Sequence, residues 1–256
     1  MSQPLETSST SQVANTSQVA FILVRPQFLG NIGSVARLMK NFGFSDLRFV
    51  EPPRNYKDAE ARKMAVGAFD ILKGSKTFSS LPEAIDDLHY VIGTSSGQQR
   101  KEQIYDLEQA LRDLPANNQT RIGVVLGNEV DGLTRDELSH CHVIAKVPTS
   151  PEFSSLNLAQ AAGIIAYELS RHLHTVSSAA PGELKNNRLP PSVAEVDELF
   201  EQLAILLEKV EFARSYNKPL VLTELRQFFY RAMPSKREGD LLRGILHKLT
   251  QSIPEN

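Results

Sequence analysis

Short apolar runs that alternate with helical stretches constrain the fold of this chain more than any other feature. The runs have the length and continuity of buried strands, and they lie at 19–24, 47–50, 89–92, 121–126 and 142–147. Helical patterns separate them, at 31–42, 57–65, 82–88, 107–114 and 134–139. This alternation predicts an α/β fold with a mostly parallel sheet that helices cover on both faces.

A long helix that is apolar on nearly every side is predicted at 155–173. Such a helix is buried rather than amphipathic. Its N-terminus therefore carries free backbone N–H groups and the hydroxyls of Ser154 and Ser155 into the interior, where some partner must satisfy them. Serine capping of the helix is one explanation, and a bound ligand is the other.

Local composition divides the chain into four segments. Residues 1–18 are rich in Ser, Thr and Gln and predict a disordered tail, and 175–191 hold the Pro, Gly, Ser and Asn pairs of a linker. The α/β pattern spans 19–174. Helical patterns alone follow, so 192–256 is predicted to be a small helical module.

Several classes of function are excluded or limited. A net charge of −2 gives no overall signature of nucleic-acid binding, so any RNA contact must come from a local patch. The single cysteine, Cys141, leaves no intrachain disulfide and suits a reducing cytoplasm. It lies between two histidines, but neighbouring side chains of a strand point to opposite faces, so we expect no metal site. No apolar run reaches the length of about 18 residues that spans a membrane.

Polar turns follow the predicted strands, at the sheet edge where doubly wound folds bind ligands. The turns are Gly93-Thr94-Ser95-Ser96-Gly97, Gly127-Asn128-Glu129, and the stretch from Pro148 to Asn157. After the first strand, Asn31 and Gly33 are expected to form a tight turn into a helix that carries Arg37. Because Arg37 lies among apolar residues, we expect it to have a partner. A helix cap, a solvated charge and plain loops explain the same residues.

Three motifs occur in order: N-x-G-x-x-x-R from Asn31, G-N-E-x-x-G-L from Gly127 and S-S-L-N-L from Ser154. Together they resemble the motifs of the TrmH-type SPOUT RNA 2′-O-methyltransferases, over roughly residues 19–173. The run P-E-F-S-S-L-N-L-A at 151–159 and the helical extension are most similar to the TrmJ branch, which methylates the ribose 2′-OH of tRNA nucleotide 32. One departure is Asn128, where some members of that branch have Arg, which puts fine substrate preference in doubt.

The resemblance implies more than the residues alone indicate. It implies a trefoil knot in the C-terminal part of the α/β domain, a rare feature among folds, with S-adenosylmethionine bound inside it. It also implies a homodimer with active sites at the subunit interface. The implied donor-binding residues are Thr94, Ser95, Ser96, Gly127, Val147, Ser154, Ser155, Leu156 and Asn157. The implied catalytic residues are Arg37, Asn31, Glu129 and Ser155.

Two questions stay open at this point. The motifs also fit a ribose methyltransferase that acts on ribosomal RNA, and a non-catalytic RNA-binding protein could keep the same fold. Six basic residues surround the aromatic run 228–230, and they either grip the tRNA backbone or form the solvated face of a three-helix module. They are Lys218, Arg226, Arg231, Lys236, Arg237 and Arg243.

Overall fold

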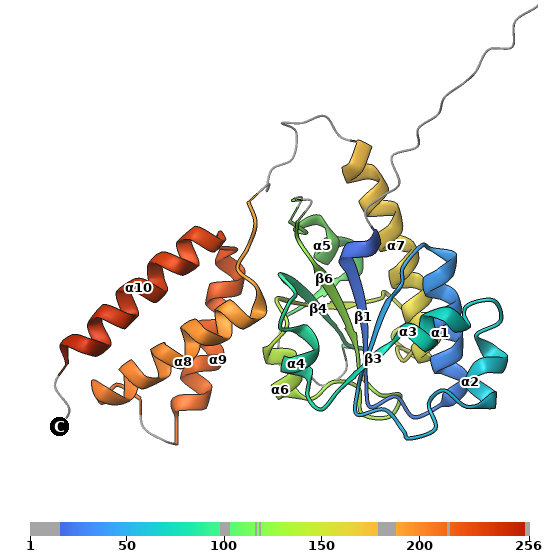
Figure 1. Cartoon of the computed structure of the whole chain (residues 1–256), viewed down its shortest axis with the longest axis horizontal. Helices are drawn as coiled ribbons and strands as arrows, with labels where there is room; N and C mark the ends of the chain where they lie inside the picture. The colour runs from blue at the N-terminus through green and yellow to red at the C-terminus, as the bar shows by residue number, and fades with distance from the viewer. Residues whose placement is uncertain are drawn as a thin grey trace, which may run out of the picture.

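A seven-stranded sheet, in the order β3-β2-β1-β6-β4-β7-β5, forms the centre of the computed structural model (Figure 1). The structure describes residues 16–97, 103–115, 117, 119–178, 188–213 and 216–253. All six pairings between neighbouring strands are parallel, which confirms the predicted sheet. The strands are β1 (Val19–Val24), β2 (Asp46–Val50), β3 (Lys76–Phe78), β4 (Tyr90–Thr94), β5 (Ile104–Asp106), β6 (Ile122–Leu126) and β7 (Val143–Lys146).

Helices cover both faces of the sheet. Every residue of β1 is buried, and since successive side chains of a strand point to opposite sides, both faces must be covered. Phe21 and Leu23 belong to one apolar cluster and Ala20 and Ile22 to another. The first cluster includes α1 (Leu29–Asn41), α2 (Ala59–Met64), α3 (Phe69–Gly74), α5 (Leu107–Arg112) and α7 (Leu158–Ser178). The second includes α4 (Leu81–Ile85) and α6 (Arg135–Ser139).

The helix after β1 begins earlier than expected. It starts at Leu29, so Asn31 lies inside its first turn and is not its cap. Gly33 also lies within α1 rather than in a turn. A Cβ at Gly33 would stand 2.1 Å from the carbonyl oxygen of Ala61, so the glycine allows α1 and α2 to pack closely. The turn chemistry expected for these two residues was therefore wrong.

The C-terminal module consists of α8 (Val193–Lys209), α9 (Lys218–Ala232) and α10 (Lys236–Ser252). It lies on the α4 and α6 side of the sheet (Figure 1). The backbone N–H groups of Val193 and Ala194 donate to the carbonyl oxygens of Leu88 (2.8 Å) and Asp86 (3.0 Å). Since the side chain of Val193 is also fully buried in the second apolar cluster, the module is anchored to the α/β unit where α8 begins.

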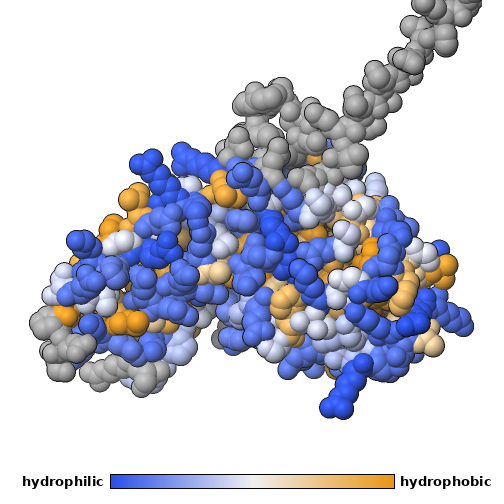
Figure 2. Space-filling model, in the orientation of Figure 1, coloured by the Kyte–Doolittle hydropathy of each residue, from blue (hydrophilic) through white to orange (hydrophobic). Residues whose placement is uncertain are grey.

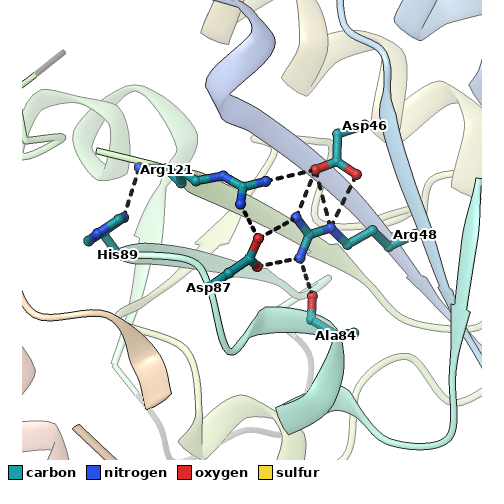
Figure 3. Close-up of polar contacts among 6 residues, drawn as sticks. All are labelled: Asp46, Arg48, Ala84, Asp87, His89 and Arg121. Carbon is teal, nitrogen blue, oxygen red and sulfur yellow. Dashed lines mark hydrogen bonds and ion pairs between the residues drawn. The ribbon is translucent and has the colours of Figure 1, made fainter. Parts of the chain in front are cut away.

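A network of charges supports the turn that receives α8 (Figure 3). The guanidinium of Arg48 is buried and donates to Asp46, to Asp87 and, at 2.7 Å, to the carbonyl oxygen of Ala84. Arg121 contacts the same two carboxylates. The favourable contacts with Arg48 outweigh burial and lower the pKa of Asp87. This network ties β2, β6 and the end of α4 together at the sheet edge opposite the carboxyl ends of the strands.

His142, beside Cys141, has a structural role at the junction with the module. Its ring lies 3.8 Å from the ring of Tyr230 on α9, and its Nδ1 accepts the N–H of Val91 at 3.1 Å. Within the described residues, no group of three or more His, Cys, Asp or Glu side chains is placed to hold a metal ion. Figure 2 shows a mostly hydrophilic surface with separate apolar patches. None of the described helices has the length and apolar character needed to span a membrane.

Stability should fall as the pH falls from about 6.5 toward 3. Burial lowers the pKa of His142 to about 3, whereas an unfolded histidine titrates near 6.5. Below pH 6.5 the unfolded chain therefore binds a proton that the folded chain does not, and each pH unit removes about 1 kcal/mol of the free energy of unfolding. Urea unfolding at pH 7, 6 and 5 measures this slope. It should be shallower in His142→Phe and unchanged in the exposed control His174→Asn. An equal slope in His142→Phe and the wild type would contradict the assignment.

Candidate functional site

A cavity opens where β6, β4 and β7 end and α7 begins. Its free space, counting the open mouth, is about 900 Å³. The three strands are neighbours in the sheet, so the polar turns that follow them converge. The lining includes eight of the nine predicted donor-binding residues, namely Thr94, Ser95, Ser96, Gly127, Val147, Ser154, Ser155 and Leu156.

The ninth residue, Asn157, lies outside the lining and caps α7. Its Oδ1 accepts the N–H of Ala159 at 2.9 Å and that of Gln160 at 3.4 Å. The helix begins at Leu158, so Ser154 and Ser155 precede the cap and do not form it, contrary to one of the two expectations. Ser154 and Ser155 instead contribute to the cavity wall.

The second motif forms a tight loop that makes one wall. Asn128 is buried, and its Oδ1 accepts the N–H groups of Val130 (2.9 Å) and Asp131 (2.8 Å). A Cβ at Gly127 would stand 2.2 Å from the carbonyl carbon of Gly132. The glycine is therefore required by the fold of the loop itself, and Asn128 shapes the wall because its side-chain oxygen bonds to its own loop.

A chain of hydrogen bonds links all three motifs beside the cavity. Asn157 Nδ2 donates to Asn31 Oδ1 at 3.0 Å, and Asn31 Nδ2 donates to Glu129 Oε1 at 2.8 Å. Glu129 also accepts the backbone N–H groups of Gln27 at 2.9 Å and Phe28 at 3.3 Å. Glu129 is also a lining residue of the cavity. The hydrogen bonds therefore hold the start of α1, the second motif and the start of α7 in one arrangement.

Replacing Glu129 with glutamine should lower the free energy of unfolding by about 2 kcal/mol. All three groups that contact Glu129 are donors, and a glutamine turns an NH₂ group toward one of them. Urea unfolding measures the loss. Asp131→Asn is the matched control, because Asp131 lines the same cavity but receives no hydrogen bond from a described residue. Equal stability of the two variants would show that the Glu129 contacts contribute little.

Arg37 does not reach this cavity. It is exposed on α1 and has no hydrogen-bond or ion-pair partner in the described part of the chain, so the partner expected for it is not found there. Beside it, α1 and α7 border a shallow groove lined by Leu38, Leu156, Ala159, Gln160, Gly163 and Ile164. Ile164 is 39% exposed and Tyr167 is 51% exposed. The face that carries Arg37 is therefore partly apolar and open.

The hydroxyl groups of the cavity differ in their availability. Thr94 Oγ1 donates to the carbonyl oxygen of Val125 at 3.0 Å, and Ser95 Oγ accepts the N–H of Gly97 at 3.1 Å. Ser96 and Ser155 have no such contact with a described residue. These two hydroxyls are thus the ones best placed to meet a ligand.

The sequence reasoning missed several residues of the lining. They include the strand-end residues Leu126 and Lys146, the loop residue Asp131, and Ala161 and Ile165 on α7. Lys146 Nζ lies 3.5 Å from Asp106 Oδ1. The strand-end residues could have been predicted, because they come just before a polar turn and so lie at the same end of the sheet. The α7 residues could not, because their place in the lining depends on the direction in which that helix runs.

Four of the six basic residues singled out in the module form ion pairs within it. Lys218 pairs with Glu208, Arg226 with Asp197, Lys236 with Glu195, and Arg243 with Glu198 and Asp240. Arg231 and Arg237 are exposed and have no ion pair with a described residue. Phe229 and Tyr230 are buried, whereas Phe228 is 63% exposed. Four of the six members of the basic cluster are therefore ion-paired, and the other two are open to solvent.

Comparisons with known proteins show which family the chain resembles over most of its length. Residues 18–167 match the SpoU rRNA Methylase family, and residues 194–256 match the C-terminal domain of the tRNA methyltransferase TrmJ. The tRNA (cytidine/uridine-2′-O-)-methyltransferase TrmJ of Pectobacterium atrosepticum is 34% identical over 93% of this chain and 98% of that protein. The crystal structure of TrmJ from Z. mobilis ZM4 has a TM-score of 0.74 at 31% identity and matches 90% of this chain and 98% of that one. A probable methylase family protein from Haemophilus influenzae Rd KW20 has a TM-score of 0.56 at 28% identity and matches 93% of this chain and 98% of that one. The chain therefore belongs to the SpoU methyltransferase family, in its TrmJ branch, as the order of the three motifs predicts.

Proposed function

We propose that this protein binds S-adenosylmethionine in the cavity and methylates the ribose 2′-OH of tRNA nucleotide 32 in the cytoplasm. The observation that carries the proposal is the convergence of the second and third motifs and the turn after β4 on one cavity. The relatives that match nearly the whole chain are named as tRNA 2′-O-methyltransferases. The position within the tRNA rests on the resemblance to the TrmJ branch.

The residues of the cavity suit such a donor. Leu126, Val147 and Leu156 offer apolar surface to the purine ring of the donor. Ser96 and Ser155 offer hydroxyl groups to the polar ends of the donor. Lys146 is the only basic side chain of the lining within the described residues, and it suits the carboxylate of an amino acid. When bound, the donor supplies an electrophilic methyl group, and the sulfonium becomes a neutral thioether on transfer.

The contribution of the chain is then orientation and charge rather than a strong base. Glu129 already accepts three hydrogen bonds, so we assign it and Asn31 to positioning. An arginine stays protonated at ordinary pH and is a poor base. We assign Arg37 to holding a phosphate next to the target ribose and stabilising charge on the attacking oxygen. The 2′-OH proton passes to that phosphate or to water.

The position of Arg37 supports the expectation of a homodimer. Because it lies outside the cavity of its own chain, we propose that it serves the cavity of a second copy, with the groove between α1 and α7 forming the contact. A mixture of Arg37→Ala and the cavity-filling variant Ser155→Tyr tests this. Half of the dimers are then mixed, and each has one complete site, so about a quarter of the wild-type activity should return. No recovery in dimers shown to be mixed by sedimentation and mass spectrometry would place both residues in one subunit.

A methyl-transfer assay tests the substrate class. Labelled S-adenosylmethionine is incubated with the protein and either purified tRNA or ribosomal RNA, because the ribosomal RNA alternative shares the first two motifs. The proposal predicts label in tRNA. Label in ribosomal RNA alone supports the alternative, and label in neither, with donor binding intact, supports a non-catalytic RNA-binding protein.

The double charge reversal Arg231→Glu/Arg237→Glu should weaken tRNA binding and leave donor affinity unchanged. If Arg231 and Arg237 each contact a phosphate, each adds about one unit to the slope of log affinity against log salt concentration. The variant should therefore reduce that slope by about two. Lys73→Glu/Lys76→Glu is the matched control, since these exposed lysines belong to α3 and β3, away from the module. An unchanged slope would remove the module from the phosphate contacts.

A further inference from the structure

Two large aromatic side chains, Phe28 and Phe153, are exposed on segments that contact or lead into the wall of the cavity. Phe28 is 57% exposed and Phe153 is 78% exposed. In the described part of the chain, neither ring stacks on another ring or contacts a cation. A single exposed ring is ordinary, but two on such segments need an explanation.

The backbone of Phe28 is fixed although its ring is free. Its N–H donates to Glu129 Oε1 at 3.3 Å, and Glu129 lines the cavity. Its carbonyl oxygen accepts the N–H of Asn31 at 3.0 Å, and this hydrogen bond lies at the start of α1. The ring therefore stands on a rigid support at one side of the polar chain that links the motifs.

The backbone of Phe153 is held in a comparable way. Its N–H donates to the carbonyl oxygen of Ser150 at 3.1 Å. The following residue, Ser154, lines the cavity, and its carbonyl oxygen accepts the hydroxyl of Thr149 at 3.2 Å. The second ring thus projects from a structured loop that leads directly into the third motif.

The hydrogen bond between Asn157 and Asn31, at 3.0 Å, joins the two supports. Phe28 is three residues from Asn31 and Phe153 is four residues from Asn157, so both rings belong to segments that this bond joins. The surroundings are polar: Gln27, Ser155 and Asn157 are exposed on the same segments. Isolated rings among polar residues suit a flat partner, whereas a subunit contact favours contiguous apolar area such as the groove between α1 and α7.

We propose that Phe28 and Phe153 stack the unpaired bases on either side of the ribose that enters the cavity. The inference rests on the proposed ribose methylation and adds how the RNA is held. Proteins recognise single-stranded RNA loops by splaying bases onto aromatic rings. Because every base has a π-face, the rings position the strand without selecting its sequence. This assigns the substrate site to an unpaired loop, since bases within a helix are already stacked.

The test compares leucine and tryptophan at the two positions. Phe28→Leu and Phe153→Leu keep an apolar side chain but remove the π-face, so each should weaken binding of unmodified tRNA about tenfold. Phe28→Trp and Phe153→Trp should restore it. Affinity for S-adenosylmethionine should stay within about twofold of the wild type. Phe212→Leu, at a 67% exposed position that follows α8 and lies outside the run 228–230, is the matched control and should change nothing.

A stem–loop RNA with 2-aminopurine next to the methylated nucleotide gives a direct reading of stacking. Its fluorescence should be quenched by the wild type and restored with the double leucine variant. Wild-type tRNA affinity and quenching in the leucine variants would overturn the proposal. So would a change in their sedimentation mass, which would place the rings in a subunit contact. Wild-type protein that binds tRNA by stacking but never methylates it would instead contradict the proposed function alone.

Discussion

Replacing Arg37 with alanine should lower the rate of tRNA methylation about a thousandfold, because the loss of one fixed donor at a developing oxyanion has effects of this order. Affinity for S-adenosylmethionine should stay within about twofold, because Arg37 is absent from the lining of its own cavity and is assigned to the RNA phosphate, not to the donor. Single-turnover methylation and calorimetry measure the two quantities separately.

The conservative variant distinguishes the role of the guanidinium from that of charge. Arg37→Lys keeps the charge but loses the planar fork that binds phosphate through two hydrogen bonds, so it should recover only a small part of the rate. The exposed Lys63→Ala, on α2, is the control for the loss of a surface charge near α1. A rate within about tenfold of the wild type in Arg37→Ala would be too small an effect for a catalytic group.

Replacing Gly127 with alanine should destabilise the protein by about 3 kcal/mol and abolish donor binding. The added methyl group would stand 2.2 Å from the carbonyl carbon of Gly132, and backbone cannot move aside as a side chain can. The loop of the second motif would have to open, and with it one wall of the cavity. Thermal unfolding with and without S-adenosylmethionine measures both effects.

A glycine in open space provides the comparison. Gly244 lies within α10 and a Cβ there meets nothing within 4 Å, so Gly244→Ala should stabilise the protein by up to about 1 kcal/mol. If Gly127→Ala behaved like Gly244→Ala, the tight loop would not be needed for the cavity.

The sheet and its helices could be predicted because their signals are local. Every residue of β1 is apolar and buried, and the long apolar run after residue 157 forms α7. The short strands β3 and β5 were not predicted, since three residues at a sheet edge bury little and show no period. The helix α3 was not predicted either, because six residues are too few to show a helical period. The trefoil knot, which the resemblance implies, stays a prediction.

The site was predictable in its residues but not in its assembly. That the turns after β4, β6 and β7 converge depends on the strand order, which no local pattern reveals. The sequence also does not show why residue 127 must be glycine. Gly127 is needed because Gly132 packs against it, and this contact exists only in the folded loop. The position of Arg37, exposed on α1 and outside the lining of the cavity, also depends on how α1 is rotated against the sheet.

The central claim is that the cavity directs a methyl group to one ribose. The most direct test incubates the protein with purified, unmodified tRNA and deuterium-labelled S-adenosylmethionine, followed by nuclease digestion and mass spectrometry of the fragments. The account predicts one labelled 2′-O-methylribose, at nucleotide 32, in the wild type and almost none in Arg37→Ala. A label on a base, or on a ribose elsewhere in the tRNA, would contradict it.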